Sequence, residues 1–256
     1  ADSIALTINL MSVFASAFAI LFMFWSLTLL IRRLLNLHGE IGSLQAKAIL
    51  GSAAIGSLAF TFTDSFWFSA VEAEVYASAA FVMSVLFYAG LRWEQEMHQP
   101  RGNRWLILIA FLIGLSFGIH FMGLLTIPAI GLLYYFKNTP NITVRNFIIA
   151  NLVSVAILLF IFKLLLPSAL KFFSGMELLF VNQIALPFNS GPIVAGILLS
   201  VLFYFGLRHT RKKNYVNLNT GLLCILFIFI GFSSWLMLPI RANANVVVNE
   251  NNPSDA

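Results

Sequence analysis

Long apolar runs separated by short polar connections make up most of the chain. A helix needs about 20 apolar residues to cross the ~30 Å hydrocarbon core of a bilayer. Runs of suitable length predict membrane spans near 5–31, 46–64, 71–91, 146–166, 191–207 and 218–240. The pattern therefore predicts an all-α fold, a polytopic transmembrane helical bundle.

The apolar stretch from residue 104 to residue 136 needs a separate interpretation. It is too long for one crossing and short for two. Basic residues lie beyond both of its ends, which favours two crossings, because cytoplasmic loops are enriched in Lys and Arg. We therefore expect two short helices, 104–119 and 122–136, with a turn near His120.

The distribution of basic residues fixes the expected topology. With about eight crossings, twelve of the 15 Lys and Arg residues fall on one side, as the positive-inside tendency requires. This places residue 1 outside, in a transmembrane domain over 1–241, and makes 242–256 a non-cytoplasmic tail that leads to a missing C-terminal region. The twelve are Arg32, Arg33, Lys47, Arg92, Arg101, Arg104, Lys137, Arg145, Arg208, Arg211, Lys212 and Lys213.

Composition agrees with a membrane protein and excludes several other classes. The chain is 60% hydrophobic and 10% charged, against about 25% charged residues in soluble domains. The net charge of +5 comes from short clusters between spans, so a nucleic-acid partner is not expected. The single cysteine, Cys224, excludes a disulfide framework.

The stretch "SFWFSAVEAEVYASAAF", from Ser65 to Phe81, places Glu72 and Glu74 beside an apolar span. If it is helical from Phe66, the two glutamates lie on different faces, and Glu74 lies deeper along the span. One interpretation is an aromatic anchor at the membrane interface, whose acids face water. The other is a functional acid at Glu74, which would need a partner such as Arg241 if it were buried.

Two further polar residues stand at the expected outer face. His120 lies in a glycine-rich turn, and is either a hydrogen-bonded core histidine or a group that lines an outward cavity. Arg241 leaves the last span and either snorkels before a disordered tail or joins the site. Metal binding by histidine has little support, and no nucleotide, hydrolase or metalloprotease motif occurs. The residues alone indicate an outward-facing polar cluster.

Three blocks occur in order along the chain: "FWFSAVEAEVYA", "GLSFGIHFMGLLTIPAI" and "LPIRANANVVVNENNPSD". Together they resemble a bacterial family of membrane proteins related to protein O-mannosyltransferases, within the GT-C superfamily of glycosyltransferases. The resemblance covers nearly the whole chain. It implies a GT-C-like fold in the bacterial inner membrane with a periplasmic active face. It also implies transfer of a mannose-like sugar from a polyprenyl-phosphate donor to a protein or glycan acceptor, with membrane lipid as the surroundings and no cofactor.

The resemblance picks out Trp67, Glu74, Tyr76, His120 and Arg241, and the topology adds Asp64 and Glu72. We expect the three carboxylates to serve as catalytic groups, Glu74 above all, and the other four residues to bind substrate. Family members begin with an earlier helix and an outer loop that bears an acidic residue and an H-P-P-G-like run. No such run occurs here, so the chain is expected to be a fragment without the first helix and loop.

Two other functions remain open at this point. A transporter would carry charged residues deep in several spans, and only Lys163, near an outer helix end, is a candidate. A non-catalytic subunit of a larger membrane assembly would use its polar loops to bind partners. A sugar-transfer assay with lipid-linked mannose separates the enzyme from both.

Overall fold

A computed structural model describes residues 2–35 and 41–244, and every regular element in these ranges is a helix. The α-helices are α1 (Asp2–Leu34), α2 (Ser43–Thr61), α3 (Asp64–Val71), α4 (Val75–Glu96), α5 (Asn103–Ser116), α6 (Thr126–Asn138), α7 (Val144–Leu159), α8 (Leu166–Leu178), α9 (Ser190–Lys212), α10 (Val216–Phe232) and α11 (Met237–Ala242). Two 3₁₀ turns, η1 (Phe121–Leu125) and η4 (Ser233–Leu236), and two π-helical segments, η2 (Phe160–Leu165) and η3 (Leu179–Gln183), complete them.

Six helical segments are long and apolar enough to cross a membrane, which confirms a polytopic helical bundle. They are Leu6–Leu34, Ser43–Thr61, Val75–Glu96, Val144–Gln183, Ser190–Lys212 and Val216–Ala242. The expected eight crossings also require α5 and α6, which have 14 and 13 residues and are shorter than the ~20 that a perpendicular crossing needs.

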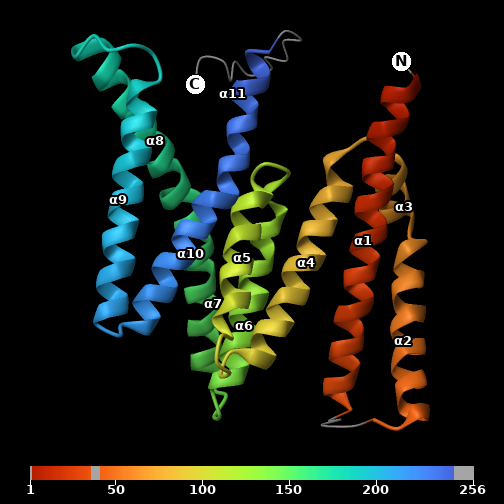
Figure 1. The fold of residues 1–256 in the computed structure, drawn as a ribbon. Coiled ribbons are helices and arrows are strands. Elements are labelled where there is room, and N and C mark those ends of the chain that lie inside the picture. The colour runs from red at the N-terminus through yellow and green to blue at the C-terminus, as the bar shows by residue number, and fades with distance from the viewer. Residues whose placement is uncertain (1, 36–40, 245–256) are drawn as a thin grey trace.

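The helices run alternately up and down between two ends of the bundle (Figure 1). The upper end carries the start of α1, the connections α3–α4 and α8–α9, and α11; the lower end carries the connections α4–α5, α6–α7 and α9–α10. The turn that joins α5 to α6 also points upward, but it lies below the upper ends of α1, α8 and α11 (Figure 1). The twelve basic residues grouped by the sequence pattern belong to helix ends and connections on the lower side.

The best-buried part of the bundle lies where α4, α5, α6 and α10 meet. Leu86, Ile113 and Ile228 are buried there, together with residues of η1 and η2. α5 and α10 cross at glycines: a Cβ atom on Gly114 would lie 2.1 Å from the carbonyl oxygen of Ile228. Such small residues let helix backbones approach closely in a membrane, where apolar burial alone does not drive association.

Two acids of α4, the buried Glu94 and the partly buried Glu96, hold the lower end together. Glu94 is 4% exposed, and its carboxylate pairs with Arg33 of α1 at 3.2 Å and Lys137 of α6 at 3.4 Å. The neighbouring Glu96 accepts hydrogen bonds from Arg104 and from the Trp105 indole of α5, each at 2.8 Å. The last turns of α4 therefore bind three other helices through two carboxylates.

The segment after Pro167 differs from its expected form. The amphipathic stretch bounded by Pro167 and Pro187 predicts a separate helix along the outer interface, but helical structure continues without a gap from Val144 to Gln183. Pro167 falls in the first turn of α8, where a missing backbone N–H is tolerated, and the π-helical turns of η2 precede it. Of the expected tail, only residues 242–244 lie within the described range.

Candidate functional site

The upper end gathers the seven candidate site residues of the sequence analysis. Asp64 begins α3, Glu72 and Glu74 lie between α3 and α4, His120 precedes η1, and Arg241 lies in the last turn of α11. The elements that carry them all face this end of the bundle (Figure 1). The contacts among these residues show which of them form one cluster.

The stretch from Ser65 to Phe81 is not one helix. α3 ends at Val71 and α4 begins at Val75, and the backbone at Glu72 and Glu74 is extended. The condition of a continuous helix from Phe66, under which the two glutamates would lie on different faces, is therefore not met. No glycine or proline marks the break; it lets both carboxylates reach solvent, whereas a continuous helix would turn one of them towards a neighbour or lipid.

Glu74 occupies the N-cap position of α4, at the positive end of the helix dipole. Its side chain and that of Glu72 are exposed, and neither has a hydrogen bond or ion pair with another described residue. In particular, Arg241 is exposed and forms no ion pair with Glu74 in the described part of the chain. Glu74 is thus an open carboxylate and not half of a buried pair.

Asp64 and Trp67 belong to the short helix α3. Asp64 lies in its first turn, where a carboxylate is favourable, and is exposed. Trp67 stacks on Phe62 with ring centroids 5.7 Å apart and remains 49% exposed. This contact lies within the α2–α3 corner, so the geometry of Trp67 also suits the aromatic anchor that the sequence left open.

Tyr76 and His120 come from two different sequence blocks and meet in space. Their ring centroids are 5.7 Å apart, and Tyr76 lies in the first turn of α4, two residues after Glu74. His120 is half-buried, and its Nδ1 accepts a hydrogen bond from the backbone N–H of Met122 at 3.2 Å. A neutral imidazole with Nδ1 as acceptor carries its proton on Nε2. His120 therefore has one nitrogen engaged in the turn and a second that can donate to a ligand.

A series of aromatic contacts leads from His120 to Lys163. In the sequence, Lys163 was relevant only to the alternative of a transporter. His120 stacks on Phe121 at 4.6 Å, Phe121 contacts Phe162 at 6.0 Å, and the Lys163 ammonium lies over the Phe162 ring at 4.9 Å. A lone lysine inside an apolar span was the available signal. Hydropathy could not show which way it points.

A close contact between Gly118 and Ser234 fixes the turn. A Cβ atom on Gly118 would lie 2.5 Å from Ser234 Oγ, so the end of α5 rests against η4. The Ser234 hydroxyl is buried without a hydrogen-bond partner in the described structure. Because η4 leads directly into α11, this contact ties the chain segment of Arg241 to the His120 turn.

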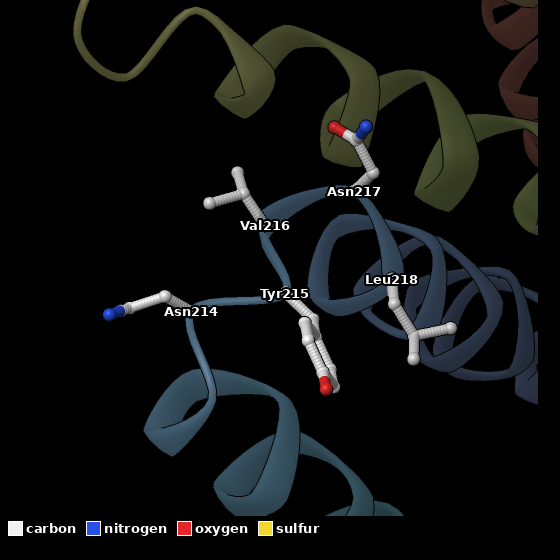
Figure 2. A pocket seen from close by; sticks show the side chains of 5 residues that line it. All are labelled: Asn214, Tyr215, Val216, Asn217 and Leu218. Atoms are coloured by element: carbon white, nitrogen blue, oxygen red, sulfur yellow. The ribbon is translucent and has the colours of Figure 1, made fainter.

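An open depression lies elsewhere. It measures about 480 Å³ and is lined by residues 214–218 (Figure 2), at the α9–α10 connection on the lower side of the bundle (Figure 1). None of the candidate site residues at the upper end lines this depression, so the site is not assigned to it. Within residues 2–35 and 41–244, no group of three or more His, Cys, Asp or Glu side chains could hold a metal ion.

Comparison with known proteins adds one finding. The family model described as "Protein O-mannosyl-transferase TMEM260 N-terminal domain" matches residues 1–143, which include Glu74, Tyr76 and His120. No curated protein and no solved structure matches the chain.

Proposed function

The chain belongs to the family of protein O-mannosyl-transferase TMEM260 N-terminal domains, and from this membership we propose that it transfers a mannose-like sugar from a polyprenyl-phosphate donor to a protein or glycan acceptor. The reaction takes place at the upper end, which we assign to the non-cytoplasmic side of the membrane. The crowding of basic residues at the lower end supports this orientation.

The contact between Tyr76 and His120 beside Glu74 carries the proposal. It brings together two blocks of the chain at the end where the open carboxylates lie. The turn with His120 lies deeper than the surrounding helix ends (Figure 1), which suits a donor whose phosphate sits near the membrane surface. The carboxylates described at the lower end, those of Glu94 and Glu96, are by contrast engaged in ion pairs.

Each residue then has a defined task. An acceptor hydroxyl is a weak nucleophile, and a carboxylate that removes its proton speeds attack on the sugar carbon. Glu74 takes this role, with Glu72 and Asp64 as further carboxylates nearby in sequence. The bond between the sugar and the phosphate oxygen breaks as the new glycosidic bond forms, and the lipid phosphate leaves with its electron pair. His120 donates from Nε2 to the sugar phosphate, Tyr76 and Trp67 pack against the sugar, and Arg241 supplies positive charge from α11.

A reconstituted transfer assay tests the proposal. The protein in lipid nanodiscs receives a polyprenyl-phosphate mannose donor and a Ser/Thr-containing acceptor peptide. Glu74→Gln should lower kcat by about 100-fold or more, the range expected for loss of a general base. Glu72→Gln is the matched comparison, since it removes another exposed charge from the same connection. Its loss of kcat should be clearly smaller, because Glu74 takes the role of the base.

The outcomes separate the competing functions. Equal and small effects of the two substitutions would remove the site from this connection and leave it as an aromatic anchor. Absence of transfer by the unmodified protein would favour a non-catalytic subunit of a membrane assembly or a transporter.

A further inference from the structure

Lys163 is an unpaired cation within an apolar span. It lies in the helical run Val144–Gln183, and its side chain is exposed. No Asp or Glu of the described residues forms an ion pair with it. Charged side chains in such spans are costly and usually serve a substrate or ion.

The Lys163 ammonium contacts an aromatic ring. It lies over the ring of its neighbour Phe162, 4.9 Å from the centroid, as in a cation–π contact. The Phe162 ring in turn packs against Phe117 at 6.3 Å and Phe121 at 6.0 Å. Lys163 thus contacts an aromatic group that extends through Phe121 to His120.

The local backbone explains this placement. Phe160–Leu165 is π-helical, a wide turn that shifts the following side chains around the helix axis and is often found at functional sites. Ile161 and Leu166 are buried in the core and hold the segment on both sides of Lys163. The wide turn therefore fixes the backbone at Lys163 next to the aromatic group.

We propose that Lys163 binds the phosphate of a phosphorylated membrane lipid, which, on the proposed function, is the donor before transfer and the released lipid phosphate afterwards. An ammonium is a compact point charge with three donors, suited to a phosphate oxygen. Its position within a membrane span matches a ligand held in the bilayer by its tail, and the absence of a paired carboxylate among the described residues leaves its charge free. His120, at the other end of these aromatic contacts, offers Nε2–H.

Lipid binding tests this role apart from catalysis. The purified protein in detergent is titrated with a short-chain polyprenyl monophosphate, with the matched uncharged polyprenol and with inorganic phosphate, and binding is followed by tryptophan fluorescence. Lys163→Gln should weaken binding of the monophosphate by about tenfold or more, the loss expected for one charge-assisted hydrogen bond. Binding of the polyprenol should not change, and Lys163→Arg should restore most of the affinity.

Lys171→Gln is the control, because Lys171 is an exposed lysine further along the same helical run. Equal affinity of the unmodified protein and Lys163→Gln for the monophosphate would overturn the proposal, as would equal losses from Lys163→Gln and Lys171→Gln. No binding of the monophosphate by the unmodified protein would overturn it too, and binding of inorganic phosphate with the same dependence on Lys163 would replace the lipid by a free anion. Binding that depends on Lys163 without any sugar transfer would leave this inference standing and refute the proposed function.

Discussion

His120 does two separable things at the residue scale. Its Nδ1 satisfies the Met122 N–H at the start of η1, and its ring joins Tyr76 to Phe121. The first is a matter of local stability, since an unsatisfied N–H at a helix start is unfavourable. The second, together with the remaining Nε2–H, is what the proposed chemistry uses.

Replacing His120 in two ways should separate these tasks. Asparagine can accept the same backbone N–H through its short side chain, whereas alanine cannot. His120→Ala should lower the free energy of unfolding by about 1 kcal/mol, the usual cost of a lost cap, while His120→Asn should stay close to the unmodified protein. Both should lose transfer activity, because neither has the Nε2–H. Thermal unfolding and the nanodisc assay measure the two effects, and full activity of His120→Asn would show that the imidazole is not used.

At the scale of elements, α4 is the helix around which the bundle is organised. Its upper end begins at the open carboxylate of Glu74 and contacts the His120 turn, and its lower end is held by Glu94 and Glu96. α5 lies against it and is itself pressed onto α10 at Gly114. The position of the site therefore depends on contacts at both ends of one helix and on one close crossing.

The crossing of α5 and α10 should not tolerate a side chain at Gly114. Gly114→Ala places a Cβ 2.1 Å from the Ile228 carbonyl oxygen, so the two helices must separate. We expect a loss of roughly 1–3 kcal/mol, as for an overpacked core. Gly221→Ala is the control on α10, where a Cβ meets no atom within 4 Å, and helix propensity should leave it neutral or slightly stabilising. Equal unfolding temperatures of the two variants in detergent would contradict this crossing.

The two partners of a lower-end ion pair should contribute unequally to the free energy of unfolding. The Glu94 side chain is 5% exposed, while those of Arg33 and Lys137 are 48% and 37% exposed. Glu94→Gln leaves two cations without their shared partner and should cost about 1–2 kcal/mol, less than a fully buried pair because water reaches both cations. Arg33→Gln should cost less than about 1 kcal/mol, since Lys137 still neutralises Glu94. A denaturation series that finds Arg33→Gln more damaging than Glu94→Gln would refute this order.

At the scale of the whole molecule, hydropathy and charge predicted much of the bundle. The rest depends on specific contacts between helices. The long spans and the break near His120 follow from apolar length and glycine content. The break at Glu72–Glu74 carries no glycine or proline, so the sequence showed no reason for it. Glu94 lies just beyond the apolar run 71–91, and its burial depends on helices that are distant in sequence. Residue patterns predict elements well, but burial of single polar groups depends on which helices meet.

The up-and-down arrangement makes a topology prediction for the intact membrane. In a variant without Cys224, single cysteines introduced at Arg101 and Lys212 should resist a membrane-impermeant thiol reagent applied from outside, and one at Asn182 should react. All three positions are exposed, so access depends on the side of the membrane and not on burial. A further position, Asn249, lies outside the described residues and is expected to react as well. Labelling at Lys212 from outside would refute the orientation with the upper end outward.

The crossing of Gly114 with the Ile228 carbonyl also bears on how the polypeptide can be divided. The family match ends at residue 143, within the connection between α6 and α7, yet the deepest contact of α5 is with a helix beyond that point. The end of the match is therefore not the edge of an autonomous unit. If the chain is cut within residues 139–143 and the two pieces are produced together, they should associate through the crossing of α5 and α10 and co-purify. Piece 1–143 made alone should aggregate, and Gly114→Ala should abolish the complementation while Gly221→Ala preserves it.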